Sequence, residues 1–211
     1  MGDFVMAMIM GFDRGKEASP IYDASKASSL TAFLNTFKGV KIVSTSPLVI
    51  ETYSDVWYMD AELNVTTWYP VYGTYEWTGF WHNIAVGWLA DADKLLTFTK
   101  SKSDVLKVDW MDYTKGPSLS ILKAKLDSAA ASNYIPYAPT LGQYITAAEA
   151  TARWSNLQAF YSKYGHFWVG DGPFILKSVF AVEKIVVLEA FSNYPDEADK
   201  WLFVLEPLVL D

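Results

Sequence analysis

Carboxylates close to aromatic side chains are the first residues in this sequence that could do chemistry. They are Asp55, Asp60, Glu62 and Glu76. A carboxylate in such a setting can bind a cationic group, such as the amino end of a peptide. A solvated surface carboxylate is the simpler interpretation of each. Asp91 and Asp93 stand two residues apart in a segment expected to be helical, so they cannot face each other as a paired acid and base.

The other groups that enzymes use for catalysis are missing from the sequence or unsuitably spaced. There is no cysteine, which excludes disulfides, thiolate metal sites and cysteine nucleophiles. His82 and His166 are far apart and show no metal-ligand spacing. No Gly-x-Ser-x-Gly, phosphate-loop or Gly-x-Gly-x-x-Gly motif occurs, because residues 170–172 lack the third glycine and precede a predicted strand. We expect no enzymatic activity, no metal and no cofactor.

Aromatic residues make up 16% of the chain, with nine Trp, thirteen Tyr and twelve Phe. Many lie between residues 55 and 81, a stretch without a sustained helical or strand period that we expect to be mostly loop. Part of this stretch forms the predicted ligand-binding set: Trp68, Tyr69, Tyr72, Tyr75, Trp77 and Trp81. Such side chains line ligand clefts, where apolar groups or sugar faces stack on them, and by the same physics they pack one lobe against another. Both interpretations stay open.

The charge balance is acidic, with 24 Asp and Glu against 17 Lys and Arg and a net charge of −7. Without a basic cluster, this balance argues against nucleic acid and anionic membranes as partners. The apolar run near the start, residues 4–10, is too short to span a membrane. Because it follows Asp3 rather than a basic region, it does not have the pattern of a signal peptide.

Capping residues and periodicity predict the helices that must position these residues. The clearest runs over 146–164, because the capping box Thr146-Ala-Ala-Glu149 opens it and Gly165 follows it. Ser29 is the predicted cap of another helix, which ends at Gly39. The remaining predicted helices span residues 3–14, 82–96, 102–111 and 117–130, and residues 134–144 form a connection.

Alternation and β-branched residues predict strands in two pairs. Residues 40–45 and 48–53 flank a short Ser-Pro turn, and residues 173–180 and 184–190 form the second pair. Each pair is predicted to be a hairpin. The sequence has no internal repeat and no break in composition, so we expect one α+β domain over residues 1–211, with helices packed on short antiparallel or mixed strands.

The segment around the second hairpin resembles a known family. Residues 170–174, Gly-Asp-Gly-Pro-Phe, lead into a strand, and residues 185–189, Ile-Val-Val-Leu-Glu, lead to Asn193-Tyr194. This order is similar to the signature of the extracellular solute-binding proteins of peptide-type ABC importers (family 5): a Gly-Thr-Gly-Pro-Tyr/Phe turn, two strands and an Asn-x-x-Tyr end. Here Asp171 stands in place of Thr, and Pro195 follows Tyr194 in place of the usual Trp.

The first part of the chain looks similar to the same family. Residues 3–5, Asp-Phe-Val, resemble the opening of a family helix, and residues 41–51 resemble a family hairpin. The Trp-rich middle and Tyr134-Ile-Pro-Tyr137 look closest to archaeal members. Because family members are longer and two-lobed, the resemblance implies a lobe or part-lobe of a periplasmic-binding-protein-like fold, within a fragment of a longer protein.

The resemblance implies transport. The expected function is to bind an oligopeptide or related small solute in a cleft between lobes and to deliver it to an ABC permease. The expected location is the extracellular face of the cell membrane or the periplasm, where the full-length protein is secreted or membrane-anchored. The expected partners are the solute, the permease and the remaining lobe of the same protein, with no nucleic acid.

Two other classes of function stay open. One is a structural or interaction domain whose aromatic side chains form a docking surface. The other is a carbohydrate-active hydrolase, which needs two carboxylates about 5 to 10 Å apart.

Overall fold

The computed structural model describes residues 1–60, 62, 80–196 and 200 of the chain. The chain divides into two compact units, Met1–Phe167 and Trp168–Asp211. Its fold is mixed α/β, with helices and short strands that pair in two-stranded sheets. The predicted class is confirmed in this general form. No helix in the described part of the chain is long and apolar enough to cross a membrane.

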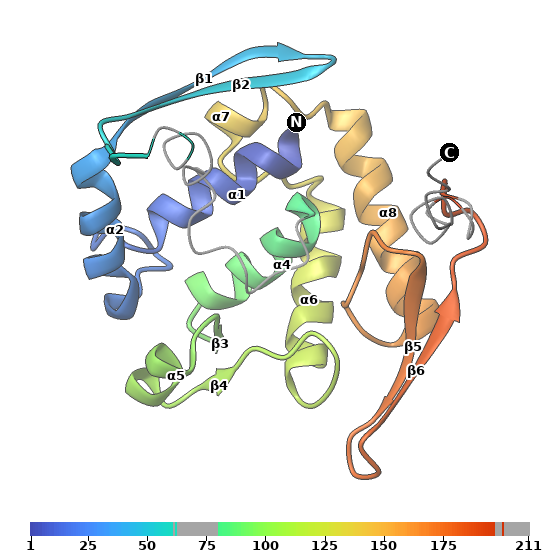
Figure 1. Cartoon of the computed structure of the whole chain (residues 1–211). Helices are drawn as coiled ribbons and strands as arrows, with labels where there is room; N and C mark the ends of the chain where they lie inside the picture. Colours follow the sequence, from blue (N-terminus) through green and yellow to red (C-terminus); the bar gives the residue numbers. More distant parts are fainter. Residues whose placement is uncertain (61, 63–79, 197–199, 201–211) are drawn as a thin grey trace, which may run out of the picture. The chain divides into compact units, whose positions relative to one another are not determined.

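The first unit is built around helix α4 (Trp81–Ala92), which is buried on nearly every side. Helices α1 (Gly2–Asp13), α6 (Ser118–Ala131) and α8 (Ala147–Tyr164) all contact it, and Figure 1 shows it in the middle of the unit. A helix that is apolar on all sides is stable only inside a core. The surrounding helices supply that core. The buried apolar residues of α4 are Trp81, Ile84, Ala85, Val86 and Ala90.

Two tryptophans connect α4 to its neighbours. The rings of Trp81 and Trp154 pack edge to face with centroids 5.3 Å apart, and both side chains are buried. The backbone N–H of Trp81 donates to Asp3 Oδ1 at 2.8 Å, so α1 supplies an acceptor at the start of α4. The indole N–H of Trp154 donates to the carbonyl oxygen of Tyr134 at 2.9 Å. These contacts fix α1, α4 and α8 relative to one another.

Gly87 allows a close approach to the other side of α4. A Cβ atom at this position would lie 2.1 Å from Tyr113 Oη and 2.8 Å from Met111 Sδ. Any larger residue would therefore displace the side chains of Tyr113 and Met111 from the helix. The Tyr113 hydroxyl is buried here, and burial, followed by the nearby charge of Asp91, raises the pKa of Tyr113.

The helices with clear capping signals follow the prediction closely. At the start of α8, Thr146 Oγ1 accepts from the Glu149 N–H at 3.1 Å. At its end, Gly165 adopts a left-handed conformation with φ of 73°. Pro117 directly precedes α6, as its fixed φ favours.

The limits of the other helices differ from the prediction. Helix α2 (Ala24–Thr36) begins earlier, because Asp23 and not Ser29 is its cap and accepts from the Ser25 N–H at 3.0 Å. Helix α4 ends at Ala92, before the predicted limit of 96. Helix α5 (Lys100–Leu106) ends where Lys107 turns left-handed. A short helix, α7 (Ala138–Leu141), lies in the predicted connection.

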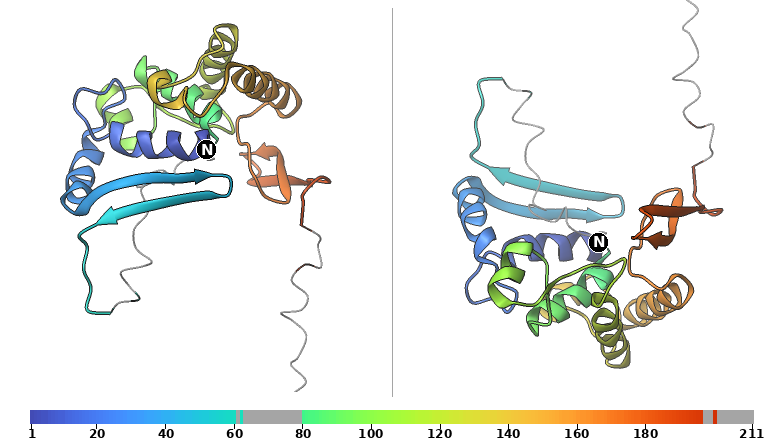
Figure 2. Two further views of the ribbon diagram at one scale, coloured as in Figure 1. Left: turned by 90° about the horizontal axis from the view of Figure 1, so that it is seen from above. Right: turned by 90° about the horizontal axis from the view of Figure 1, so that it is seen from below.

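The first predicted hairpin is confirmed. Strands β1 (Phe37–Thr45) and β2 (Leu48–Ser54) pair antiparallel, with Lys41 opposite Glu51. Figures 1 and 2 show this hairpin running alongside α1. Two residue pairs, β3 (Leu96–Thr97) and β4 (Asp109–Trp110), make a parallel contact that the sequence did not predict. Most of the expected loop at 55–81 lies outside the described residues.

The second predicted hairpin is also confirmed and lies in the second unit. Strands β5 (Phe174–Phe180) and β6 (Ile185–Ala190) pair antiparallel, with Phe174 opposite Ala190. Lys177 and Glu189 form an ion pair at 3.2 Å. A two-stranded sheet alone is marginally stable in water.

We predict that His82 makes the first unit sensitive to acid. Its side chain is 6% exposed and packs near Trp81 and Trp154. Burial, and then the charge of Arg153, lowers the pKa of His82 to about 4, although Asp3 opposes the shift. Unfolded histidine titrates near 6.5. Between about pH 6.5 and 4 the unfolded chain therefore binds a proton that the folded chain does not, and folding stability falls as the pH falls.

The expected loss is about 3 kcal/mol of unfolding free energy by about pH 4. Urea denaturation at several pH values measures it. The matched variant is His82→Gln, which does not titrate and should show a shallower decline over the same window. Parallel profiles for the two proteins would contradict the prediction.

Candidate functional site

Trp81 is the one member of the predicted ligand-binding set within the described residues. Trp68, Tyr69, Tyr72, Tyr75 and Trp77 lie outside them. Trp81 is fully buried at the start of α4, with its ring against Trp154. In this structure Trp81 packs in the core, and the binding role of the set stays a prediction.

The carboxylates near the aromatic stretch are surface groups where the structure describes them. Asp55 pairs with Lys38 at 2.9 Å, and both side chains are more than half exposed. Asp60 and Glu62 are exposed, and Glu76 lies outside the described residues. Exposed ion pairs of this kind contribute little to stability and leave no enclosed site.

Asp91 and Asp93 have separate environments, as their spacing predicts. Asp91 is buried and pairs with Lys102, whereas Asp93 is exposed and pairs with Lys125. The two carboxylates do not act on a common site.

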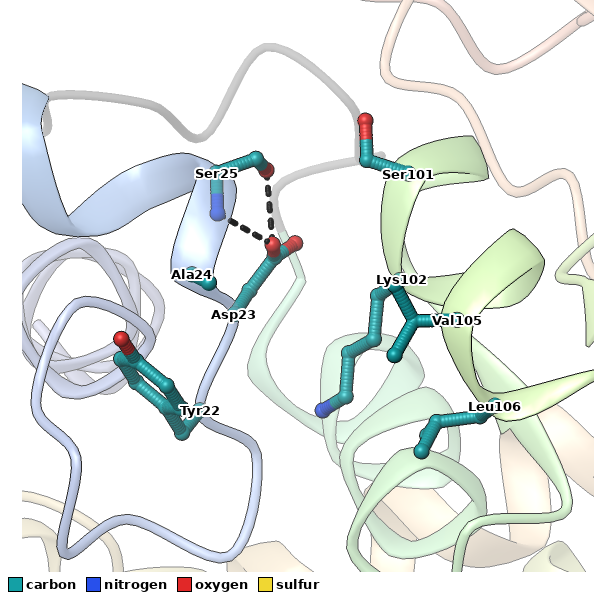
Figure 3. Close-up of a pocket in the computed structure, with 8 residues that line it drawn as sticks. All are labelled: Tyr22, Asp23, Ala24, Ser25, Ser101, Lys102, Val105 and Leu106. Carbon is teal, nitrogen blue, oxygen red and sulfur yellow. Dashed lines mark hydrogen bonds between the residues drawn. The ribbon is translucent and has the colours of Figure 1, made fainter.

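A small pocket of about 230 Å³ lies where α2 and α5 begin. Figure 3 shows its lining, which includes Tyr22, Asp23, Ser25, Lys102 and Leu106. Asp23 caps α2, Thr99 caps α5, and Thr99 Oγ1 donates to Asp23 Oδ2. A single hydrogen bond therefore joins the starts of the two helices.

Asp23 is held as a carboxylate by several donors. It accepts from the Ser25 N–H at 3.0 Å and from Ser25 Oγ at 2.6 Å, and Arg14 lies 3.6 Å from it. Burial opposes its ionisation, but the hydrogen bonds from Ser25 and Thr99 and the charge of Arg14 outweigh burial and lower the pKa of Asp23. Asp23 thus has a structural role, because both of its carboxylate oxygens already accept hydrogen bonds.

A second ion pair lies beside the same pocket. Lys102 Nζ bonds Asp91 Oδ1, and the Phe98 N–H donates to Asp91 Oδ2 at 3.0 Å. Burial raises the pKa of Asp91, although Lys102 and the Phe98 N–H act against the shift. The two acids, with Arg14 and Lys102, form a charge-balanced cluster. This cluster stabilises the junction of α1, α2, α4 and α5, and it engages both charged residues that line the small pocket, Asp23 and Lys102.

A larger groove of about 470 Å³ lies between α1, β1 and α7. Its walls are apolar: Met8, Ile9 and Phe12 come from α1, and Phe37, Val40 and Ile42 from β1. Asp13, Lys16 and Tyr137 make a polar end of the groove near the carboxyl end of α1, and Thr140 and Tyr144 also line it. An apolar cavity of this size with a few polar groups is typical of a small-molecule site.

Tyr137 connects three elements at the polar end of the groove. The Trp88 indole N–H donates to Tyr137 Oη at 2.7 Å, and that hydroxyl donates to Asp13 Oδ2 at 2.5 Å. Burial raises the pKa of Tyr137, and its hydrogen bond to Asp13 raises it further. The backbone of Tyr137 is left-handed, with φ of 48°, which is uncommon for a bulky residue. The arrangement can bind a ligand through the Asp13 carboxylate, which the Tyr137 hydroxyl holds in place.

Sequence reasoning did not single out Asp13 or Asp23 as site residues. Tyr137 stood out only as part of Tyr134-Ile-Pro-Tyr137. An Asp before the run Ala24 to Thr36 is a capping signal that could have identified Asp23. No signal marks Asp13, because its place at the groove depends on β1 and α7.

Compared with known proteins, the chain matches no family model and no curated protein. The function therefore rests on the resemblance within the sequence and on the geometry of these sites.

We predict that Asp23→Ala destabilises the first unit by about 3 kcal/mol, because it removes a helix cap and the carboxylate beside buried Arg14. Urea denaturation measures the loss. The control is Asp93→Ala, which breaks an ion pair whose carboxylate is more than half exposed and should cost less than about 1 kcal/mol. Equal losses in the two variants would show that the buried cluster is not needed for stability.

Proposed function

We propose that this chain belongs to the solute-binding component of a peptide-type ABC importer. In this proposal the whole protein lies outside the cell membrane or in the periplasm, binds an oligopeptide or related solute, and passes it to the permease. The chain contributes a lobe or part-lobe of a periplasmic-binding-protein-like fold. The solute, the permease and the rest of the same protein are its partners, and no cofactor or chemical step is involved.

The observation that carries the proposal is the hairpin that follows Gly170-Asp-Gly-Pro173. Strand β5 begins at Phe174, directly after this turn, and pairs antiparallel with β6 before Asn193 and Tyr194. This is the order of turn, strand and strand on which the resemblance depends, and the adjacent pair Asn193-Tyr194 stands where the family has Asn-x-x-Tyr. Residues 41–51, which resemble a hairpin of the same family, lie within the β1–β2 hairpin.

The apolar groove of the first unit supports binding as the mode of action. It offers a volume suited to a small ligand, with apolar walls and polar groups at one end. The charged residues at the nearby small pocket are engaged in ion pairs and caps. Binding needs only such complementarity, so the groove supports a binding role without a chemical step.

An interaction domain is the second candidate, because the second unit has exposed apolar side chains. Phe174, Val186 and Leu188 are each 57% to 58% exposed on β5 and β6. Apolar residues gathered on a two-stranded sheet are typical of a surface that another protein segment covers. This candidate predicts binding of a macromolecule and no response to small solutes.

Thermal unfolding of the full chain tests the proposal. A panel of di- to hexapeptides and oligosaccharides is added at millimolar concentration. A solute present at about a hundred times its dissociation constant stabilises the folded state by about 2.7 kcal/mol, which raises the unfolding temperature by roughly 5 to 10 °C. We expect such a rise with at least one class of peptide.

The same samples serve as the control for the alternatives. No rise with any solute would contradict the proposal and favour the interaction domain. Release of shorter sugars from an oligosaccharide would overturn it in favour of the hydrolase.

A further inference from the structure

The groove between α1, β1 and α7 combines apolar walls with one fixed negative charge. We propose that it binds an apolar solute that carries a protonated amine, with the apolar body between α1 and β1 and the ammonium group on Asp13. This inference rests on the proposed function, since it names a class of solute for the same groove. The site lies wholly within the first unit.

The apolar body is matched by the two facing elements. Along β1, Val40 and Ile42 are half-buried and line the groove, whereas Lys41 between them is exposed. Met8 and Phe12 line the groove from α1. The space of about 470 Å³ between these faces is enough for an aromatic ring or a chain of several carbons. Filling it would bury apolar surface on both elements and stabilise the complex.

Asp13 supplies a negative charge that forms no ion pair within the described part of the chain, although Lys16 lines the same groove. The last turn of α1 holds no basic residue, and the guanidinium of the following residue, Arg14, lies 3.6 Å from Asp23 in the buried cluster. The carboxyl end of a helix also carries partial negative charge, which favours a cation there. The groove therefore has charge complementarity to an ammonium group at this end.

Tyr137 holds the Asp13 carboxylate in place before any ligand binds. Its hydroxyl donates to Asp13 Oδ2 at 2.5 Å, and the Trp88 indole N–H in turn donates to the hydroxyl at 2.7 Å. No other described residue hydrogen-bonds to the Asp13 side chain, which leaves Oδ1 available as an acceptor. The strained left-handed backbone of Tyr137 brings its side chain to this position. A carboxylate oriented in advance binds a cation at lower entropic cost.

Lys16 also lines this end of the groove, and its positive charge could favour an anionic solute. Lys16 is exposed, and a lysine in water is a mobile charge on a flexible stem. Asp13 is half-buried and held by Tyr137. The fixed charge at the groove is therefore negative, and it favours a cation over an anion.

Isothermal titration of the full chain with three probes of similar shape tests the inference. The probes are 2-phenylethylamine, 2-phenylethanol and phenylacetate, used at about pH 7 and low salt. We expect the amine to bind about tenfold more tightly than the alcohol, because a charge-assisted hydrogen bond is added. The anion should bind most weakly. Equal affinity for amine and alcohol, or tighter binding of the anion, would overturn the inference.

Matched variants locate the site. Asp13→Asn should reduce amine affinity about tenfold and leave alcohol affinity unchanged. Asp104→Asn makes the same change in net charge at an exposed pair with Lys100 and should change neither affinity. Val40→Trp should fill the groove and weaken both probes. Equal loss of amine binding in the Asp13 and Asp104 variants would overturn the site.

Two further measurements keep the test decisive. Tyr137→Phe retains the Asp13 charge but removes the hydroxyl that orients it, so we expect a few-fold loss of amine affinity even if Asp13→Asn fails to fold.

The peptide panel separates this inference from the proposed function. A peptide response without amine preference would overturn the inference alone, and amine binding without any peptide or sugar response would support the site and contradict the importer.

Discussion

Burial of α4 on nearly every side is the constraint on which the first unit depends. A helix without a polar face has to be covered by several neighbours at once, and α1, α6, α8 and the segment around Tyr113 all contact it. Asp3 binds the first N–H of the helix, Trp154 packs on Trp81, and Gly87 leaves room for Tyr113. The chain crosses this region repeatedly because no single neighbour could cover α4.

Covering α4 has an electrostatic consequence, because its last turn includes the buried Asp91. Lys102 and the Phe98 N–H compensate that charge, and Arg14 and Asp23 balance each other nearby. Arg14 directly follows Asp13 in the chain. Arg14 is used inside the cluster, whereas Asp13 lies at the edge of an apolar groove, and Tyr137 is its one side-chain donor among the described residues. Arg14, with a structural role, and Asp13, with a candidate binding role, thus lie next to each other at the end of α1.

The apolar side chains of the two hairpins are half-buried or exposed, whereas those of the core are buried. In β5 and β6 the residues are half-buried or exposed and none is buried, and neither strand has a third strand beside it among the described residues. In β1, half-buried Val40 and Ile42 face the groove beside α1. Solute binding and protein docking both use apolar surface. They differ in enclosure, since the groove is bounded by three elements and the β5–β6 surface is open.

The sequence by itself determined the elements whose signals are local. A capping box at Thr146, a proline at 117 and β-branched alternation on both sides of short turns each act within a few residues, so α8, α6 and both hairpins were predictable. The cap of α2 was misplaced to Ser29, although the local signal of Asp23 before Ser25 was present, and Thr99 and Arg14 add contacts to Asp23 that the local sequence does not show.

Tertiary structure alone decided the sites. The burial of Trp81, the pairing of Asp91 with Lys102 and the meeting of Asp13 with Tyr137 join residues from separate elements. Composition indicated aromatic binding surfaces but could not say which aromatic side chains are buried. The physical reason is that exposure and electrostatic environment depend on long-range packing, whereas caps and alternation depend on neighbours along the chain.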